Sequence, residues 1–113
     1  HNLKDEVGYN LPAVIHFDIV PGDKIDIEYA AKGGGSENVS RATVLAPAQG
    51  KEGIKNFVKE VISNAGPNPC PPIIVGVGIG GTFEVAAKSS KHALFREAGT
   101  SNPNPELDKF EKE

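Results

Sequence analysis

The chain has one cysteine, no methionine and no tryptophan among its 113 residues. The single cysteine excludes an internal disulfide bond. The sequence has no apolar run of transmembrane length and no signal-peptide pattern, so we predict a cytoplasmic protein that does not contact a membrane. Because methionine is absent and residue 1 is His, we expect this sequence to be an internal fragment of a longer chain.

Basic residues are also few, and they are scattered along the sequence. Twelve Lys and Arg stand against fifteen Asp and Glu, which gives a formal net charge of −3. Nucleic-acid-binding surfaces are typically basic, so we expect no nucleic-acid partner. A chain of this length with 38% hydrophobic residues is typical of one domain with a modest core, and we expect residues 1–113 to form it.

Several segments have the apolar pattern of β-strands. Apolar and polar residues alternate over residues 13–20 and again over residues 24–31, and Pro21-Gly22-Asp23 between them favours a turn, which predicts an antiparallel hairpin. A third short strand is predicted at residues 41–46. The β-branched run at residues 73–77 suits a strand buried on both faces. The polar stretch at residues 1–10 is expected to be a loop.

Two segments have helical periodicity. Between Gly50 and Gly66 the apolar residues follow the i, i+3, i+4 spacing, and Gly66 is suited to end that helix. A second helix is predicted at residues 83–96, whereas residues 99–113 resemble a linker and the start of a further helix without a core to dock on. The predicted fold class is therefore α/β (α+β), with a mixed or antiparallel sheet of about four strands packed with two main helices.

Three successive glycines, Gly33, Gly34 and Gly35, interrupt the strand pattern. A glycine run costs backbone entropy on folding, so it is favoured where the chain needs positive φ or close approach. Its backbone N–H groups are able to form an anion-binding nest. The alternative is a flexible connection between two strands.

The chain's only cysteine lies in a second glycine- and proline-rich stretch at residues 68–82. Pro69, Pro71 and Pro72 stiffen the loop around Cys70, as a metal-binding thiolate would require. The glycines that follow do not have the spacing of a dinucleotide or phosphate loop, and we expect most of them to let a helix pack tightly on the sheet. Thr82 is placed to cap the helix that begins near residue 83.

Together these two stretches resemble a known family. Cys70-Pro71-Pro72 running into Gly78-Ile79-Gly80-Gly81-Thr82, preceded by Lys32-Gly33-Gly34-Gly35-Ser36-Glu37-Asn38, resembles the α portion of the class I iron–sulfur-dependent fumarases and L-tartrate dehydratases. The resemblance covers residues 8–96 and implies the α subunit, or N-terminal α domain, of a hydro-lyase. It implies reversible hydration of a small dicarboxylic acid, for which fumarate to malate is favoured over tartrate dehydration.

The resemblance also implies which residues form the site. Cys70 would be one of three cysteines holding a 4Fe-4S cluster, the other two lying elsewhere. Gly33 to Gly35 would lie beside the substrate, with the contact expected at Gly34. The catalytic base is expected outside this chain, in a β subunit or C-terminal β domain. His16 and His92 are expected to be surface residues.

Two further expectations concern assembly and the competing interpretation. We expect a homodimer or larger assembly, and a fragment that is inactive by itself. The alternative is a non-enzymatic assembly or small-anion-binding domain with a structural cysteine.

Overall fold

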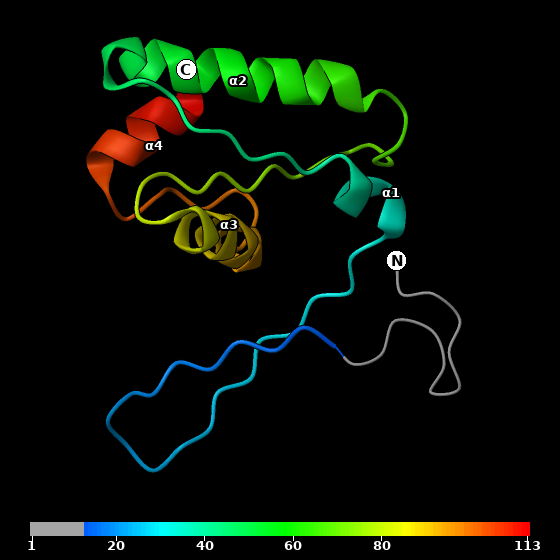
Figure 1. Cartoon of the computed structure of the whole chain (residues 1–113). Helices are drawn as coiled ribbons and strands as arrows, with labels where there is room; N and C mark the ends of the chain where they lie inside the picture. The colour runs from blue at the N-terminus through cyan, green and yellow to red at the C-terminus, as the bar shows by residue number, and fades with distance from the viewer. Residues whose placement is uncertain (1–12) are drawn as a thin grey trace.

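A computed structural model describes residues 13–113 (Figure 1). The loop expected at residues 1–10 lies outside this range. The helices are α1 Gly34–Asn38, the 3₁₀ turn η1 Pro47–Gln49, α2 Gly50–Ala65, α3 Phe83–His92, the 3₁₀ turn η2 Ala93–Phe95 and α4 Pro105–Lys112. None of the helices formed by residues 13–113 is long and apolar enough to cross a membrane.

The two main helices form where their apolar periodicity predicts them. Helix α2 ends at Ala65 because Gly66, at φ 55°, reverses the chain in a conformation that residues with a β-carbon rarely adopt. Thr82 is the N-cap residue of α3, as expected, although its side chain accepts no capping hydrogen bond. The end of the second predicted helix differs, because α3 ends at His92 and tightens into η2.

The predicted four-strand sheet is wrong for residues 13–113, which contain helices and turns but no β-strand. Outside the helices, the backbone hydrogen bonds of this part of the chain join groups only three or four residues apart. Alternation identifies a segment with two chemically different faces, but a strand also needs backbone pairing with a neighbour. The correction applies to the segments that were expected to be strands, namely residues 13–20, 24–31, 41–46 and 73–77.

Two of these segments nevertheless form a layer between helices. Residues 41–46 and residues 73–79 run between α2 and α3 (Figure 1), and side chains from all four line one groove of about 790 Å³. Helix α2 carries the chain back from the end of the first segment to the start of the second. Both segments therefore run toward the same end of the molecule.

Little apolar surface is buried in this arrangement. Ala65, at 5% exposure, is the one buried hydrophobic residue among residues 13–113, so the expected modest core is not formed by this part of the chain. The first two extended segments are the most open, since Phe17 is 83% exposed and Ile19 fully so. Their polar side chains instead approach α3, where Asp18 pairs with Lys88 at 2.9 Å.

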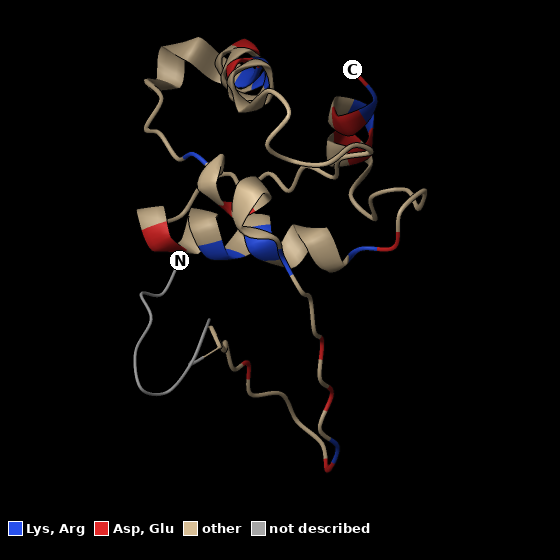
Figure 2. Ribbon diagram, turned by 90° about the vertical axis from the view of Figure 1, so that its right-hand side faces the viewer, with Lys and Arg blue, Asp and Glu red and all other residues tan. Residues whose placement is uncertain are grey.

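The C-terminal helix α4 was expected to have no core to dock on, and its contacts with the rest of residues 13–113 are mainly ion pairs. The guanidinium of Arg96 donates to both carboxylate oxygens of Glu111, at 3.0 and 2.6 Å. Lys55 of α2 pairs with Glu113 at 2.5 Å. Figure 2 shows acidic and basic residues side by side on this helix, so its attachment is made largely by ion pairs rather than by a core.

The tightest packing is between α3 and the segment that follows Cys70. A β-carbon built on Gly76 would lie 2.1 Å from the carbonyl oxygen of Ser90, and one built on Gly78 would lie 1.9 Å from that of Ala86. Any larger residue would force α3 away from the segment. The prediction that these glycines admit a closely packed helix is confirmed, although the helix packs on an extended segment and not on a sheet.

Gly78→Ala should therefore destabilise the chain, by about 1–3 kcal/mol, which is the usual cost of overpacking. The control is Gly33→Ala, because Gly33 has φ −68° and its added β-carbon would meet only Ser36 Oγ, at 3.9 Å. Denaturant unfolding followed by circular dichroism measures both variants. Equal stability of Gly78→Ala and Gly33→Ala would show that α3 does not pack on residues 73–79 as described.

Candidate functional site

The glycine run does not form a flexible connection or a left-handed turn. Gly33 is the N-cap residue of α1, with φ −68° and ψ 148°, and Gly34 and Gly35 begin the helix. None of the three has positive φ. The carbonyl of Gly33 accepts hydrogen bonds from the N–H of Glu37 and the hydroxyl of Ser36, both at 3.0 Å, which closes the first turn. Backbone N–H groups in a first turn lack acceptors within the helix and are available to an anion.

A glycine run is also favoured where two backbone segments approach closely, and such an approach is observed at Gly35. A β-carbon on Gly35 would lie 2.5 Å from the backbone oxygen of Asn68, in the turn that follows α2. Asn68 is two residues before Cys70, whose thiol is exposed. The two motifs that are more than thirty residues apart in the sequence therefore lie side by side, where the chain leaves α2 and passes α1 (Figure 1).

Charged side chains attach the glycine run to α3. The carboxylate oxygen Oε2 of Glu37 accepts from Lys32 Nζ at 2.8 Å and also from Lys91 Nζ. Lys91 lies in the last turn of α3, 54 positions from Glu37. Two ammonium groups share one carboxylate, so the surroundings of α1 carry excess positive charge, as an anion-binding site requires.

Residues 13–113 can supply one cysteine ligand to a metal cluster but not a complete set of ligands. Among residues 13–113, no group of three His, Cys, Asp or Glu side chains is arranged to hold a metal ion. Cys70 by itself supplies a single soft ligand, on a loop stiffened by proline. His16 and His92 are exposed, and the nearest acidic group to His92 Nδ1 is Glu28 at 3.8 Å, so the prediction that both are surface residues is confirmed.

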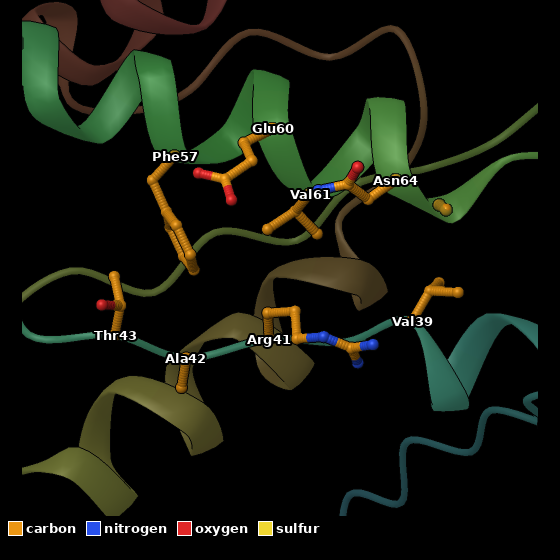
Figure 3. A pocket seen from close by; sticks show the side chains of 9 residues that line it. Val39, Arg41, Ala42, Thr43, Phe57, Glu60, Val61 and Asn64 are labelled. Carbon is orange, nitrogen blue, oxygen red and sulfur yellow. The ribbon is translucent and has the colours of Figure 1, made fainter.

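A smaller cavity, of about 210 Å³, lies under α2 and was not anticipated from the sequence (Figure 3). Glu60 and Asn64 of α2 face it from one side and Thr43 from the other. Arg41 also lines it, but its guanidinium donates to the carbonyls of Asn38 and Ser40, at 2.7 and 2.8 Å, and so closes the end of α1. No periodicity or motif in the sequence distinguishes these residues. The larger groove between α2 and α3 reaches the residues that flank the glycine run, since Lys32, Ser36 and Glu37 are among its lining residues.

Comparison with known proteins identifies the family. The model of the fumarate hydratase (Fumerase) family matches residues 1–113. The chain belongs to this family. A relative from Methanocaldococcus jannaschii, named "Putative L(+)-tartrate dehydratase subunit alpha", is 50% identical over 113 residues, which are 99% of this chain and 40% of the relative. The L(+)-tartrate dehydratase subunit alpha of Escherichia coli strain UTI89 is 42% identical over 111 residues, 97% of this chain and 36% of the relative.

A third relative, the L(+)-tartrate dehydratase subunit alpha of E. coli strain K12, is 40% identical over 111 residues, with the same coverage of 97% and 36%. The chain thus spans about two fifths of the length of the curated relatives it matches. No solved structure matches the chain. The resemblance to the hydro-lyase family is confirmed, and the comparisons do not support the non-enzymatic alternative.

The Glu37 contacts lead to a prediction about pH. Hydrogen bonds from Lys32 and then Lys91 hold the pKa of the Glu37 carboxyl below its ordinary value of 4.5. Because the pKa is lower in the folded chain, the stabilisation from these contacts is present above pH 4.5 and is lost as the pH falls through the lowered value. Carbon-13 NMR of the Glu37 carboxyl during an acid titration should give a midpoint below 4.5.

In the same titration, Lys91→Met should raise the Glu37 midpoint, because one of its two cationic partners is removed. The matched control is Lys88→Met, also on α3, since Lys88 pairs with Asp18 instead. If both variants shift the midpoint equally, the contact between Lys91 and Glu37 is not the cause.

Proposed function

We propose that this chain is part of the α subunit or α domain of an iron–sulfur hydro-lyase that adds water to, or removes water from, a small dicarboxylic acid. The observation that carries the proposal is the family match along all 113 residues, with relatives named as tartrate dehydratase α subunits. The sequence prediction favoured fumarate as substrate, although the distinction depends on side chains outside this sequence, whereas the names of the relatives favour L(+)-tartrate. Assays of both reactions are therefore needed.

Within this function, Cys70 would supply one ligand of a 4Fe-4S cluster and the glycine run would bind a carboxylate of the substrate. When bound, such a cluster supplies an iron that acts as a Lewis acid toward the substrate. The contact between Gly35 and Asn68 supports a shared site, because it brings the two motifs within reach of one small molecule. Backbone N–H groups of the glycine run that make no hydrogen bond within α1 would donate to an anionic group there.

The remaining parts of the site would come from outside this sequence. Residues 13–113 offer one thiol and no group of three His, Cys, Asp or Glu side chains that could hold a metal ion. The other cluster ligands and the catalytic base are therefore assigned to the rest of the α subunit and to a β subunit or β domain. The exposed apolar side chains of residues 13–31 favour further contacts, in a homodimer or larger assembly. The cytoplasmic location and the description of residues 1–113 as one domain stay predictions.

The first test is the activity of this chain by itself. The purified 113-residue chain, treated anaerobically with iron and sulfide, should neither hydrate fumarate nor dehydrate tartrate, because a single thiol does not complete a cluster site. Fumarate hydration is followed by the loss of fumarate absorbance, and tartrate dehydration by formation of its keto acid. Turnover by the chain by itself would refute the assignment of the catalytic base to another segment.

The second test uses the complete enzyme. Cys70→Ala should lower the cluster content and abolish turnover, because it removes a thiolate ligand. Ser63→Ala, which also removes one γ atom from an exposed position but lies on α2, is the matched control. Iron and sulfide content, visible absorbance and turnover are measured for both after anaerobic reconstitution. A Cys70→Ala enzyme with normal cluster content would exclude Cys70 as a ligand.

A further inference from the structure

The glycine run contacts the cysteine loop, residues 68–72, at Gly35. Gly35 lies against the backbone of Asn68, so close that a β-carbon there would be 2.5 Å from the Asn68 oxygen. This contact by itself would not prevent the glycine run and the cysteine loop from moving apart or shifting relative to each other. A second connection is needed if a small substrate is to meet both at fixed distances.

The structure contains that second connection, and it passes through α3. From Cys70 the chain continues into residues 73–79, against which α3 is packed at Gly76 and Gly78. The backbone oxygen of Ser90 is the atom that a β-carbon on Gly76 would meet, at 2.1 Å. The last turn of α3 is therefore held in a fixed position relative to the cysteine loop.

The next residue along α3 reaches back to the glycine run. Lys91, directly after Ser90, donates to the carboxylate of Glu37 in α1, which also accepts from Lys32 at 2.8 Å. Glu37 is two residues beyond Gly35, and its N–H is bonded to the carbonyl of Gly33 at 3.0 Å. The cysteine loop is thus connected to α1 in two ways. One connection runs through α3 and the Lys91–Glu37 pair, and the other is the direct contact between Asn68 and Gly35.

We propose that Glu37 and Lys91 are positioning residues that hold the glycine run against the cysteine loop. The geometric part of the proposal depends on the observed contacts alone, whereas its consequence for catalysis rests on the proposed function. The two side chains are paired with each other, and the catalytic effect assigned to them is exerted through the backbone of residues 33–35.

The expected effect of removing the Lys91–Glu37 ion pair depends on how exposed the two side chains are to solvent. The side chains of Lys91 and Glu37 are 38% and 50% exposed, so solvent screens their attraction. Exposed pairs of this kind contribute modestly, and their loss should change the equilibrium between attached and detached glycine run by roughly two- to fivefold. Loss of the pair should therefore loosen the site without unfolding the chain.

The single cysteine allows a direct test in the full 113-residue chain. A nitroxide attached to Cys70 broadens the NMR signals of nearby amides, and the amides of Gly33, Gly34 and Gly35 are the probes. In the wild-type chain these signals should be strongly broadened. Lys91→Met and Glu37→Gln should each weaken the broadening, whereas Lys88→Met, which removes a neighbouring cation paired with Asp18, should not.

Several outcomes would overturn the proposal. Absence of broadening at residues 33–35 in the wild-type chain would show that the two motifs do not lie together. Unchanged broadening in Lys91→Met and Glu37→Gln would show that the pair does not hold them, and circular dichroism verifies that each variant remains folded. If one of these two variants unfolds, the other still shows whether the pair holds the two segments together. Unfolding of both variants would contradict the proposal, which assigns only a modest stabilisation to the pair.

A kinetic measurement in the complete enzyme then tests the catalytic consequence. Lys91→Met should lower kcat/KM roughly two- to fivefold, chiefly through KM, and Lys91→Arg should restore it because a cation is again available to Glu37. An unchanged kcat/KM, or a loss that Lys91→Arg does not restore, would refute the catalytic role. If the enzyme catalyses neither reaction, the proposed function fails, whereas the NMR result still decides the geometric role.

Discussion

The arrangement of this molecule depends on the close packing of α3 against residues 73–79. Gly76 and Gly78 present no side chain to the helix, so its backbone approaches to distances that a β-carbon would not allow. This contact connects the segment after Cys70 with the helix that carries Lys88 and Lys91. Through these lysines, α3 reaches both the first extended segment and the glycine run. Few apolar side chains are buried elsewhere, and short backbone approaches replace an ordinary hydrophobic core.

Close approach also explains the glycines of the candidate site. Gly35 lies against the turn that leads to Cys70, and the run as a whole begins a short helix rather than a flexible loop. Two lysines from different segments share the carboxylate of Glu37, so this cluster of three side chains carries a net positive charge. A chain with a net charge of −3 thus contains a locally positive cluster of side chains, which its overall composition does not indicate.

The apolar side chains of residues 13–31 are exposed. In residues 13–31 the acidic side chains Asp18 and Glu28 approach α3, whereas the alternating apolar side chains, such as Phe17 and Ile27, are more than four-fifths exposed. A period of two in the sequence specifies only which side chains would share a face of an extended segment. Strand formation also needs a neighbouring backbone, and residues 13–113 provide none in register. The curated relatives are about two and a half times as long, and such surfaces are usually covered by further chain or by another subunit.

The sequence by itself determined the two main helices, the turn at Gly66, the closely packed glycines and the family, because local periodicity, backbone preferences and motif spacing all depend on residues near one another in the chain. The helical start of the glycine run, the docking of α4 through Arg96 and Lys55, and the carboxylate shared by Lys32 and Lys91 were decided only by the tertiary structure. These contacts join positions up to 58 residues apart, and an ion pair between surface residues has no periodicity or spacing that marks it in advance. The candidate site is divided in the same way. Its residues were predicted from their motifs, whereas their proximity depends on α2 returning the chain to α1 and on α3 linking the two.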